Sequence, residues 1–466
     1  RFFIRFNLTE NHFLVALAMV VGIGGGFGSI LFQRLLELTV FWLSSLGQVL
    51  PSYALPLIPA IGGLAAGLLV YFFAQEAKGA GVSEVMNAIV TRQGVIRGRV
   101  GVVKALASAL TLGSGGSAGS EGPIVQIGAA WGSGLGKIFK FSENNLKLLI
   151  ACGSAAGISA IFNAPIAGVL FALEVILGDF TIAAFTPVVV SSVLSAVVAQ
   201  AYRGDRPVFE VPDYHFVSAF ELGWFVLLAV LVGIVGVLFI RVIYGAEDFF
   251  EKIDWLPEWF KPAIGGALVG GIGLGYPEVM GVGYRTVETA LQGNIVMPVL
   301  LVLLGGKLLT TSMTISTGGS GGFFAPSLFI GATLGGAVGR FAEAYLPGTV
   351  STPGAYALVG MGAMVAGTTH APLTAMLMIF EMTGSYHIIL PLMVATILAV
   401  IVARSIERES IYSLKLARRG IRIHQGRDLS VLEKIPVSQI MRTDYDFVRE
   451  HMPLGEIVGL IQHGSL

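Results

Sequence analysis

The chain has 466 residues, of which 54% are hydrophobic and only 12% are charged, and its mean hydropathy is +0.79. Since a soluble domain carries about a quarter charged residues, this composition excludes an ordinary soluble protein and predicts a polytopic membrane protein. The 29 basic and 29 acidic residues cancel, so no net charge attracts nucleic acid, and a single cysteine excludes an intramolecular disulfide framework.

Apolar runs follow one another along the chain up to residue 405. The first run, residues 12–48, is longer than the about 20 residues of one membrane crossing, so we expect a tilted helix or a pair of helices there. Further helices are expected at 54–75, 101–118, 123–139, 146–176, 182–201, 217–244, 260–275, 296–315, 326–345, 355–380 and 387–405. Several of these runs are shorter than a full crossing, which predicts helices that begin or end inside the membrane.

Basic segments indicate the orientation. The loop at residues 91–99 contains three arginines, and a second cationic stretch lies at residues 404–422. By the positive-inside rule, both segments are expected on the cytoplasmic side. We therefore expect a multi-pass protein of the lipid bilayer, in the plasma (inner) membrane, with cytoplasmic termini.

The chain also repeats itself. An offset of 203 positions superimposes Lys104 on Lys307 and the glycine-rich stretch 113–123 on the stretch 316–326. Two homologous halves, about 50–215 and 216–425, are the simplest interpretation within a transmembrane domain that spans residues 1–425. Such halves commonly hold a substrate site at their interface, on broken helices whose N-termini face an anion.

Each glycine-rich stretch ends at a proline, Pro123 or Pro326, where we expect a helix to begin. Free backbone N–H groups at a helix N-terminus form an anion site, although small residues that pack helices together would leave the same pattern. Glu121 stands in the first stretch where Phe324 stands in the second. A carboxylate within a membrane is costly and usually functional, so we interpret Glu121 as a group that blocks an anion site and leaves it when protonated, rather than as a surface glutamate.

Two other repeated positions have simpler interpretations. An offset of 207 superimposes Glu174 on Glu381, and a shared structural role at helix ends is favoured over a proton path. Lys307 mirrors Lys104 and is interpreted as a side chain that extends toward the membrane surface.

Four segments together resemble the signatures of the CLC family of chloride channels and chloride/proton exchangers. In chain order they are Gly79–Glu84, Gly119–Pro123, Gly322–Pro326 and Ser410–Tyr412. The resemblance covers most of residues 12–425. It implies an all-α homodimer with one pore per subunit, built from two inverted repeats with discontinuous helices, that transports chloride or other small anions.

The resemblance also implies roles for individual residues. Glu121 would be the gating glutamate, Lys104 a basic residue near the pore, and the hydroxyl of Tyr412 a ligand of the central anion. The other anion-binding positions implied are Ala80, Ser120, Gly122, Phe323, Phe324 and Ala325. Residues 426–466 resemble, from about Val437, a truncated CBS-like cytoplasmic segment, which could bind a nucleotide when complete.

Three positions depart from the family pattern. Ala80 replaces the serine whose hydroxyl contacts the central anion, which leaves selectivity for chloride over nitrate open. Ser83 replaces a proline. Val175 stands at the internal proton-transfer glutamate of the exchangers, and valine there is typical of channels, although some exchangers also lack the glutamate. A glutamate-gated chloride channel is therefore favoured, with a chloride/proton exchanger as the alternative.

A different class of function fits less well. An intramembrane serine protease could use Ser320 as nucleophile and His370 as base. However, Ser117 repeats Ser320 without a matching histidine, because Asn163 stands opposite His370. No Gly-Lys-Ser/Thr follows the glycines, so a nucleotide-binding loop is not expected either. We therefore expect no enzyme, with no catalytic residues, no metal ligands and no cofactor.

Overall fold

The computed structural model describes residues 10–49, 51, 54–212, 214, 220–421, 451–455 and 457–458. It divides the chain into two units, Arg1–Arg422 and Ile423–Leu466. Nearly all of the expected CBS-like segment, including Val437, lies outside the described residues. Within the described part, the first unit is helical, and its β-type pairings are two isolated bridges, Gly79 with Ser320 and Gly119 with Gly322.

The helices of the first unit fall into two successive series. The first series comprises α2 (Glu10–Val49), α3 (Leu57–Phe73), η2 (Gln75–Ala77), α4 (Val82–Thr91), α5 (Gly98–Gly113), α6 (Glu121–Ile138), α7 (Glu143–Phe162), α8 (Pro165–Leu170), the π-helical turn η3 (Phe171–Leu177) and α9 (Ile182–Arg203). The second comprises α10 (Glu221–Glu251), α11 (Lys261–Gly273), η4 (Pro277–Val279), α12 (Tyr284–Leu291), α13 (Met297–Ser316), α14 (Phe324–Tyr345), α15 (Pro353–Thr369), α16 (Pro372–Thr383), α17 (Ile389–Ile406) and α18 (Ser413–Arg418).

Each predicted apolar run contains at least one helix, but the number of helices differs in places. The run 12–48 forms a single helix, α2, rather than a pair. The runs 146–176 and 355–380 are each broken, at Asn163 and at His370, where the backbone takes a left-handed conformation. No apolar run predicts α12 or α18, since six to eight residues of mixed polarity do not resemble a membrane crossing.

Two helices begin earlier than predicted. The sequence places the first residue of each at Pro123 and Pro326, whereas α6 begins at Glu121 and α14 at Phe324. Proline is tolerated throughout the first helical turn because the N–H groups there have no partner within the helix. Glu121 is therefore part of α6 itself.

By length and composition, six helices among the described residues can cross a membrane. They contain the segments His12–Ser45, Glu143–Phe162, Ile182–Arg203, Glu221–Glu251, Met297–Ser316 and Ile389–Ile406. Shorter apolar helices, such as α3 and α16, accompany them.

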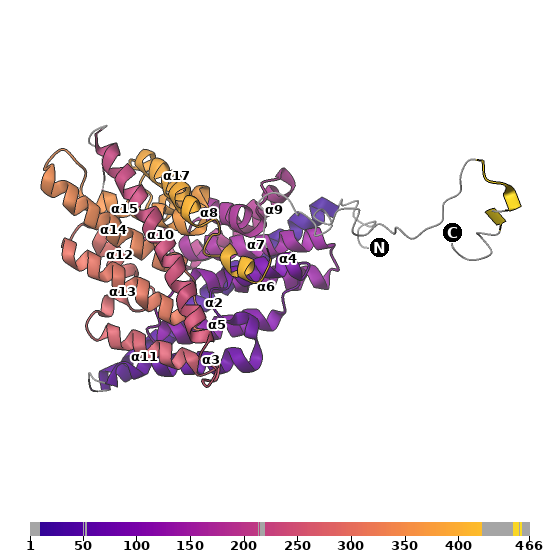
Figure 1. The fold of residues 1–466 in the computed structure, drawn as a ribbon, viewed down its shortest axis with the longest axis horizontal. Helices are drawn as coiled ribbons and strands as arrows, with labels where there is room; N and C mark the ends of the chain where they lie inside the picture. Colours follow the sequence, from indigo (N-terminus) through magenta and orange to yellow (C-terminus); the bar gives the residue numbers. More distant parts are fainter. Residues whose placement is uncertain are drawn as a thin grey trace. The chain divides into compact units, whose positions relative to one another are not determined.

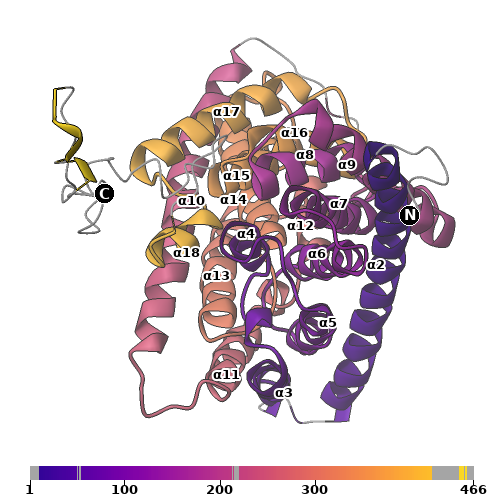
Figure 2. The same ribbon diagram turned by 90° about the vertical axis from the view of Figure 1, so that its right-hand side faces the viewer.

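The helices are arranged so that α6 and α14 meet inside the first unit. Figure 1 shows α12 to α15 gathered to the left and α4, α6, α7 and α9 to the right. The long helix α2 runs along one flank of the unit, where it contacts α5, α6, α7 and α9 (Figure 2). α6 and α14 contact each other as well, so residues at their N-termini can form one site.

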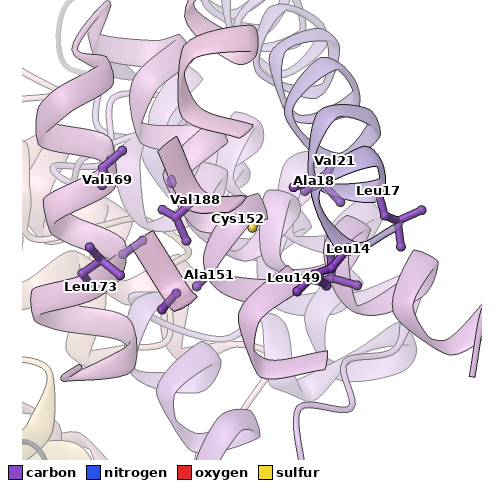
Figure 3. Packing of buried hydrophobic residues seen from close by; sticks show 13 residues of the cluster. Leu14, Leu17, Ala18, Val21, Leu149, Ala151, Cys152, Val169, Leu173 and Val188 are labelled. Atoms are coloured by element: carbon purple, nitrogen blue, oxygen red, sulfur yellow. The ribbon is translucent and has the colours of Figure 1, made fainter. Parts of the chain in front are cut away.

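A compact apolar cluster fixes α2 on this flank. Leu14, Ala18 and Val21 of α2 face Leu149 and Cys152 of α7, and all five side chains are buried (Figure 3). The small residues in this cluster let the helices approach closely, as is usual in membranes. α2 is thus packed firmly against the helix that supports α6.

Glycines allow two equivalent close helix crossings. A β-carbon added at Gly128 of α6 would lie 2.0 Å from the carbonyl oxygen of Gly153 in α7, and one added at Gly153 would lie 2.0 Å from that of Gly128. In the second series, Gly331 of α14 and Gly360 of α15 stand in the same relation at 2.3 Å. A larger residue at any of these positions would push two backbones apart.

We therefore predict that Gly153→Val lowers the melting temperature of the purified protein by several degrees, because overpacking costs about 1–3 kcal/mol. Gly134→Val is the matched control, since a β-carbon at Gly134 of α6 meets nothing within 4 Å. Thermal unfolding in detergent, followed by size-exclusion chromatography, measures both. Equal melting temperatures for the two variants would contradict the close crossing.

Candidate functional site

The site lies where the loops before α6 and α14 meet. The N–H of Gly119 donates to the carbonyl oxygen of Gly322 at 2.8 Å, and the N–H of Gly322 donates to that of Gly119 at 2.7 Å. These two glycines are equivalent under the offset of 203 found in the sequence. The two stretches therefore contact each other through matching positions.

Hydroxyl groups around these loops are paired in the same reciprocal way. Ser117 meets Thr311 at 3.0 Å between hydroxyl oxygens, and Ser108 meets Ser320 at 2.8 Å. The N–H groups of Ser117 and Ser320 donate to the hydroxyls of Thr314 and Thr111 respectively. Each contact has its counterpart at equivalent positions, so the loops are held by a buried polar network that belongs equally to both series.

Glu121 breaks this equivalence. Its side chain is 1% exposed, and its Oε1 accepts a hydrogen bond of 2.6 Å from the N–H of Phe324, the first residue of α14. A helix N-terminus attracts negative charge through its free N–H groups and its dipole. The carboxylate is thus held at the N-terminus of α14, where negative charge is stabilised.

Glycines leave the space that this carboxylate fills. A β-carbon at Gly119 would lie 2.0 Å from Oε2 of Glu121, and a β-carbon at Gly322 would lie 2.2 Å from Oε1. Among the described residues, Oε2 has no hydrogen-bond partner. A buried carboxylate oxygen without a partner is costly. The hydrogen bond from the N–H of Phe324 to Oε1 offsets part of this cost and holds the side chain at the start of α14.

Phe323 and Tyr412 lie beside the N-terminus of α14. Tyr412 directly precedes α18 and is 1% exposed, and its hydroxyl has no hydrogen-bond partner among the described residues. Its ring centroid is 6.4 Å from that of Phe323, which directly precedes α14. Unpaired buried hydroxyls are rare, so the hydroxyl of Tyr412 is available to a ligand.

The first signature segment packs against the start of α6. A β-carbon at Gly122 would lie 2.0 Å from the carbonyl oxygen of Ala80, so the two backbones are in close contact. Ser120, which directly precedes α6, is 5% exposed, as is Ala80. Ser83, which replaces the family proline, is buried, and its hydroxyl has no partner in the described part of the chain.

The two equivalent lysines support loops. Nζ of Lys104 donates to the carbonyl oxygens of Ala77 and Gly79, and Nζ of Lys307 donates to those of Val279 and Gly281. Both side chains are fully buried. Lys307 therefore does not extend toward the membrane surface, which corrects that interpretation.

Glu174 and Glu381 cap helices reciprocally. The carboxylate of Glu381 accepts hydrogen bonds from the N–H groups of Ile166 and Ala167 at the start of α8. The carboxylate of Glu174 accepts from those of Leu373 and Thr374 at the start of α16. This arrangement agrees with a structural role at helix ends.

The position expected for an internal proton-transfer glutamate is apolar. Val175 is 9% exposed and lies in the π-helical turn η3, directly after Glu174. The carboxylate of Glu174 is directed at the N-terminus of α16 rather than placed at the position of Val175.

The structure does not bring the suggested protease residues together. The hydroxyl of Ser320 bonds to Ser108 and to the carbonyl oxygen of Ala77. His370 ends α15 in a left-handed conformation, and Asn163 ends α7 in the same way. Among the described residues, Nε2 of His370 has no hydrogen-bond partner, so it does not activate Ser320.

Comparison with known proteins decides the family. Residues 62–404 match the family described as voltage gated chloride channel. The chain belongs to this family, the CLC proteins. CLC proteins are channels and transporters rather than enzymes, in agreement with the expectation from the sequence. The chain is accordingly an integral, multi-pass membrane protein.

Individual relatives cover most of the chain. A putative chloride channel protein, ClcB-like, from Ralstonia nicotianae is 37% identical over 87% of this chain and 97% of its own length. The H+/Cl− exchange transporter ClcA of Vibrio cholerae is 36% identical over 86% of this chain and 88% of its own. The crystal structure of a slow cyanobacterial Cl−/H+ antiporter has a TM-score of 0.82 and 28% identity, covering 88% of this chain and 98% of that one.

The contacts around the residues of this site were not predicted from the sequence. The sequence did not indicate that Glu121 reaches the N–H of Phe324, its own equivalent in the second series. The pairing of the hydroxyl of Ser108 with that of Ser320, and of the hydroxyl of Thr311 with that of Ser117, was not predicted either. The offset of 203 superimposes one pair on the other.

We predict that Glu381→Ala and Glu174→Ala each lower the stability of the folded protein by about 0.5–2 kcal/mol, since each leaves helix N–H groups without their acceptor. Glu343→Ala is the control, because this half-exposed glutamate pairs, in the part of the chain that the structure describes, only with Arg340 on its own helix. Melting temperatures in detergent compare the three. A shift from only one of the two capping glutamates would contradict their reciprocal role.

Proposed function

We propose that this protein carries chloride across the membrane along a path that Glu121 opens and closes. The observation that supports this most directly is the hydrogen bond from the N–H of Phe324 to Oε1 of Glu121. The carboxylate occupies an anion site made of helix amides, and a chloride ion needs the same groups. Anion and carboxylate therefore compete for one place.

The neighbouring groups fit the proposed ligands of the anion. With the carboxylate displaced, the amide of Phe324 is free, and Tyr412, which packs against Phe323, has a hydroxyl without a partner among the described residues. Phe323, Ser120, Gly122 and Ala80 supply backbone around the same place. Lys104 is proposed to act through the loop that it supports, at Gly79, rather than as a ligand.

We further propose that the two helical series are inverted repeats within residues 1–425, with halves of about 50–215 and 216–425. The reciprocal contacts of Gly119 with Gly322 and of Glu174 with Glu381 support a two-fold relation between them. A homodimer in the plasma (inner) membrane, with cytoplasmic termini and a CBS-like segment at 426–466, completes the proposal.

Chloride could cross by passive conduction or in exchange for protons. Passive conduction is favoured by Val175, since valine at that position is typical of the channels of this family, although some exchangers also lack the glutamate. Chloride/proton exchange is favoured by relatives, because a 36% identical protein is named an H+/Cl− exchange transporter and a similar structure is that of a Cl−/H+ antiporter. Passive conduction remains our proposal, with exchange as the alternative.

We predict that chloride efflux from liposomes rises as the pH falls, because protonation removes the charge that holds the carboxylate of Glu121 at the amide of Phe324. Glu121→Gln should raise efflux at neutral pH and abolish its dependence on pH. Glu343→Gln, remote from the site, serves as the control. If Glu121→Gln keeps the pH profile of the unaltered protein, Glu121 is not the gate.

A second measurement separates channel from exchanger. Chloride efflux and external pH are recorded together in liposomes whose membrane potential is clamped by potassium and valinomycin. We expect efflux without stoichiometric proton uptake, because no carboxylate stands at Val175 to relay protons. Proton movement in a fixed ratio to chloride, driven uphill by the chloride gradient, would establish exchange instead.

A further inference from the structure

Three basic residues on α18 and directly after it form ion pairs with acidic residues of other helices. Nζ of Lys415 lies 3.4 Å from Oε1 of Glu247 in α10, and Arg418 pairs with the neighbouring Asp248. Arg419 lies 2.9 Å from Glu84 of α4. Since α18 begins directly after Tyr412, these charged residues follow Tyr412 within about two helical turns along the chain.

Lys415 also lies beside the loop at Gly79. Its Nζ lies only 3.5 Å from the place that a β-carbon on Gly79 would take. The carbonyl oxygen of Gly79 accepts a hydrogen bond from Nζ of Lys104. Two ammonium groups therefore stand beside the same glycine, whose neighbour Ala80 contacts the start of α6.

The two lysines differ in their access to water. Lys104 is fully buried, and its hydrogen bonds among the described residues go to carbonyl oxygens. The side chains of Lys415 and Glu247 are 18% and 21% exposed, whereas those of Arg418 and Asp248 are 37% and 43% exposed. Lys415 is thus a partly dehydrated charge between surrounding water and the loop at Gly79, where salt screens it less than it screens Arg418.

The charge of Lys415 is opposed but not fully enclosed. Glu247 approaches it through one oxygen at 3.4 Å, longer than the 2.7–2.9 Å of a strong charge-assisted hydrogen bond. An anion near Gly79 would be attracted by Lys415 and repelled by Glu247. Fixed charges in a cleft with poorly solvated walls change the local concentration of small anions strongly.

We propose that Lys415 and Glu247 form a charge pair at the mouth of the anion path, in which Lys415 draws anions toward the loop at Gly79 and Glu247 limits this attraction. This inference rests on the proposed function. It assigns both side chains as positioning residues that set the rate of anion passage without contacting Glu121.

Opposite effects of the two neutralised charges test the proposal. In liposomes holding the full chain, Lys415→Gln should slow initial chloride efflux about threefold to tenfold, and Glu247→Gln should accelerate it by at least about twofold. The double variant should return toward the unaltered rate. Lys415→Arg, which keeps the charge, should retain most of the activity.

Ionic strength provides a readout that a merely structural role would not move. At constant chloride, potassium gluconate raises the ionic strength from about 0.1 M to about 1 M and shortens the Debye length from about 10 Å to about 3 Å. The differences between the variants should shrink under these conditions. A slow rate caused by misfolding would not recover with salt.

Arg418→Gln is the matched control, since it removes a more exposed positive charge from the same helix, and its efflux should change less than about twofold. The proposal is overturned if Glu247→Gln fails to accelerate efflux, or if Arg418→Gln slows it as much as Lys415→Gln. Should Lys415→Gln fail to fold, the acceleration by Glu247→Gln still decides the question. If the unaltered protein carries no chloride, the proposed function itself fails, which is a separate result.

Discussion

The reciprocal hydrogen bonds between Gly119 and Gly322 are the constraint on which the site depends. They bring the starts of α6 and α14 together, so that the carboxylate of Glu121 in α6 reaches the N–H of Phe324 in α14. A side chain on either glycine would clash with this carboxylate. The surrounding hydroxyl pairs and the close glycine crossings of α6 with α7 and of α14 with α15 keep these loops in position.

Many positions of the loops before α6 and α14 are equivalent under the offset of 203, but position 121 differs from its equivalent, position 324. Where the second series has Phe324, the first has a carboxylate, and this carboxylate reaches the amide of that same phenylalanine. A negative side chain on one half is therefore bound by the helix of the other half. The binding energy that a helix N-terminus offers an anion is used here to hold a side chain of the protein itself.

Much of this could be predicted from the sequence, because an offset of 203 and a carboxylate among apolar residues are visible in it. The helical fold and the interest of Glu121 followed from these patterns, whereas the roles of Tyr412 and Phe323 were implied by the family resemblance. The starts of α6 and α14 were wrong by two residues, since proline is tolerated at several positions of a first turn. The direction of the side chains of Glu121, Lys307 and Lys415 could not be predicted, because it depends on contacts between segments far apart in the chain.

The packing of α2 against α7 has a practical consequence. Cys152 is the sole cysteine of the chain, and in this cluster its thiol is completely enclosed by neighbouring side chains (Figure 3). A thiol-reactive reagent therefore finds no accessible target on the folded native protein. A cysteine introduced at any exposed position becomes the single reactive group, so spectroscopic labels can report on movements of the helices without removal of the natural residue.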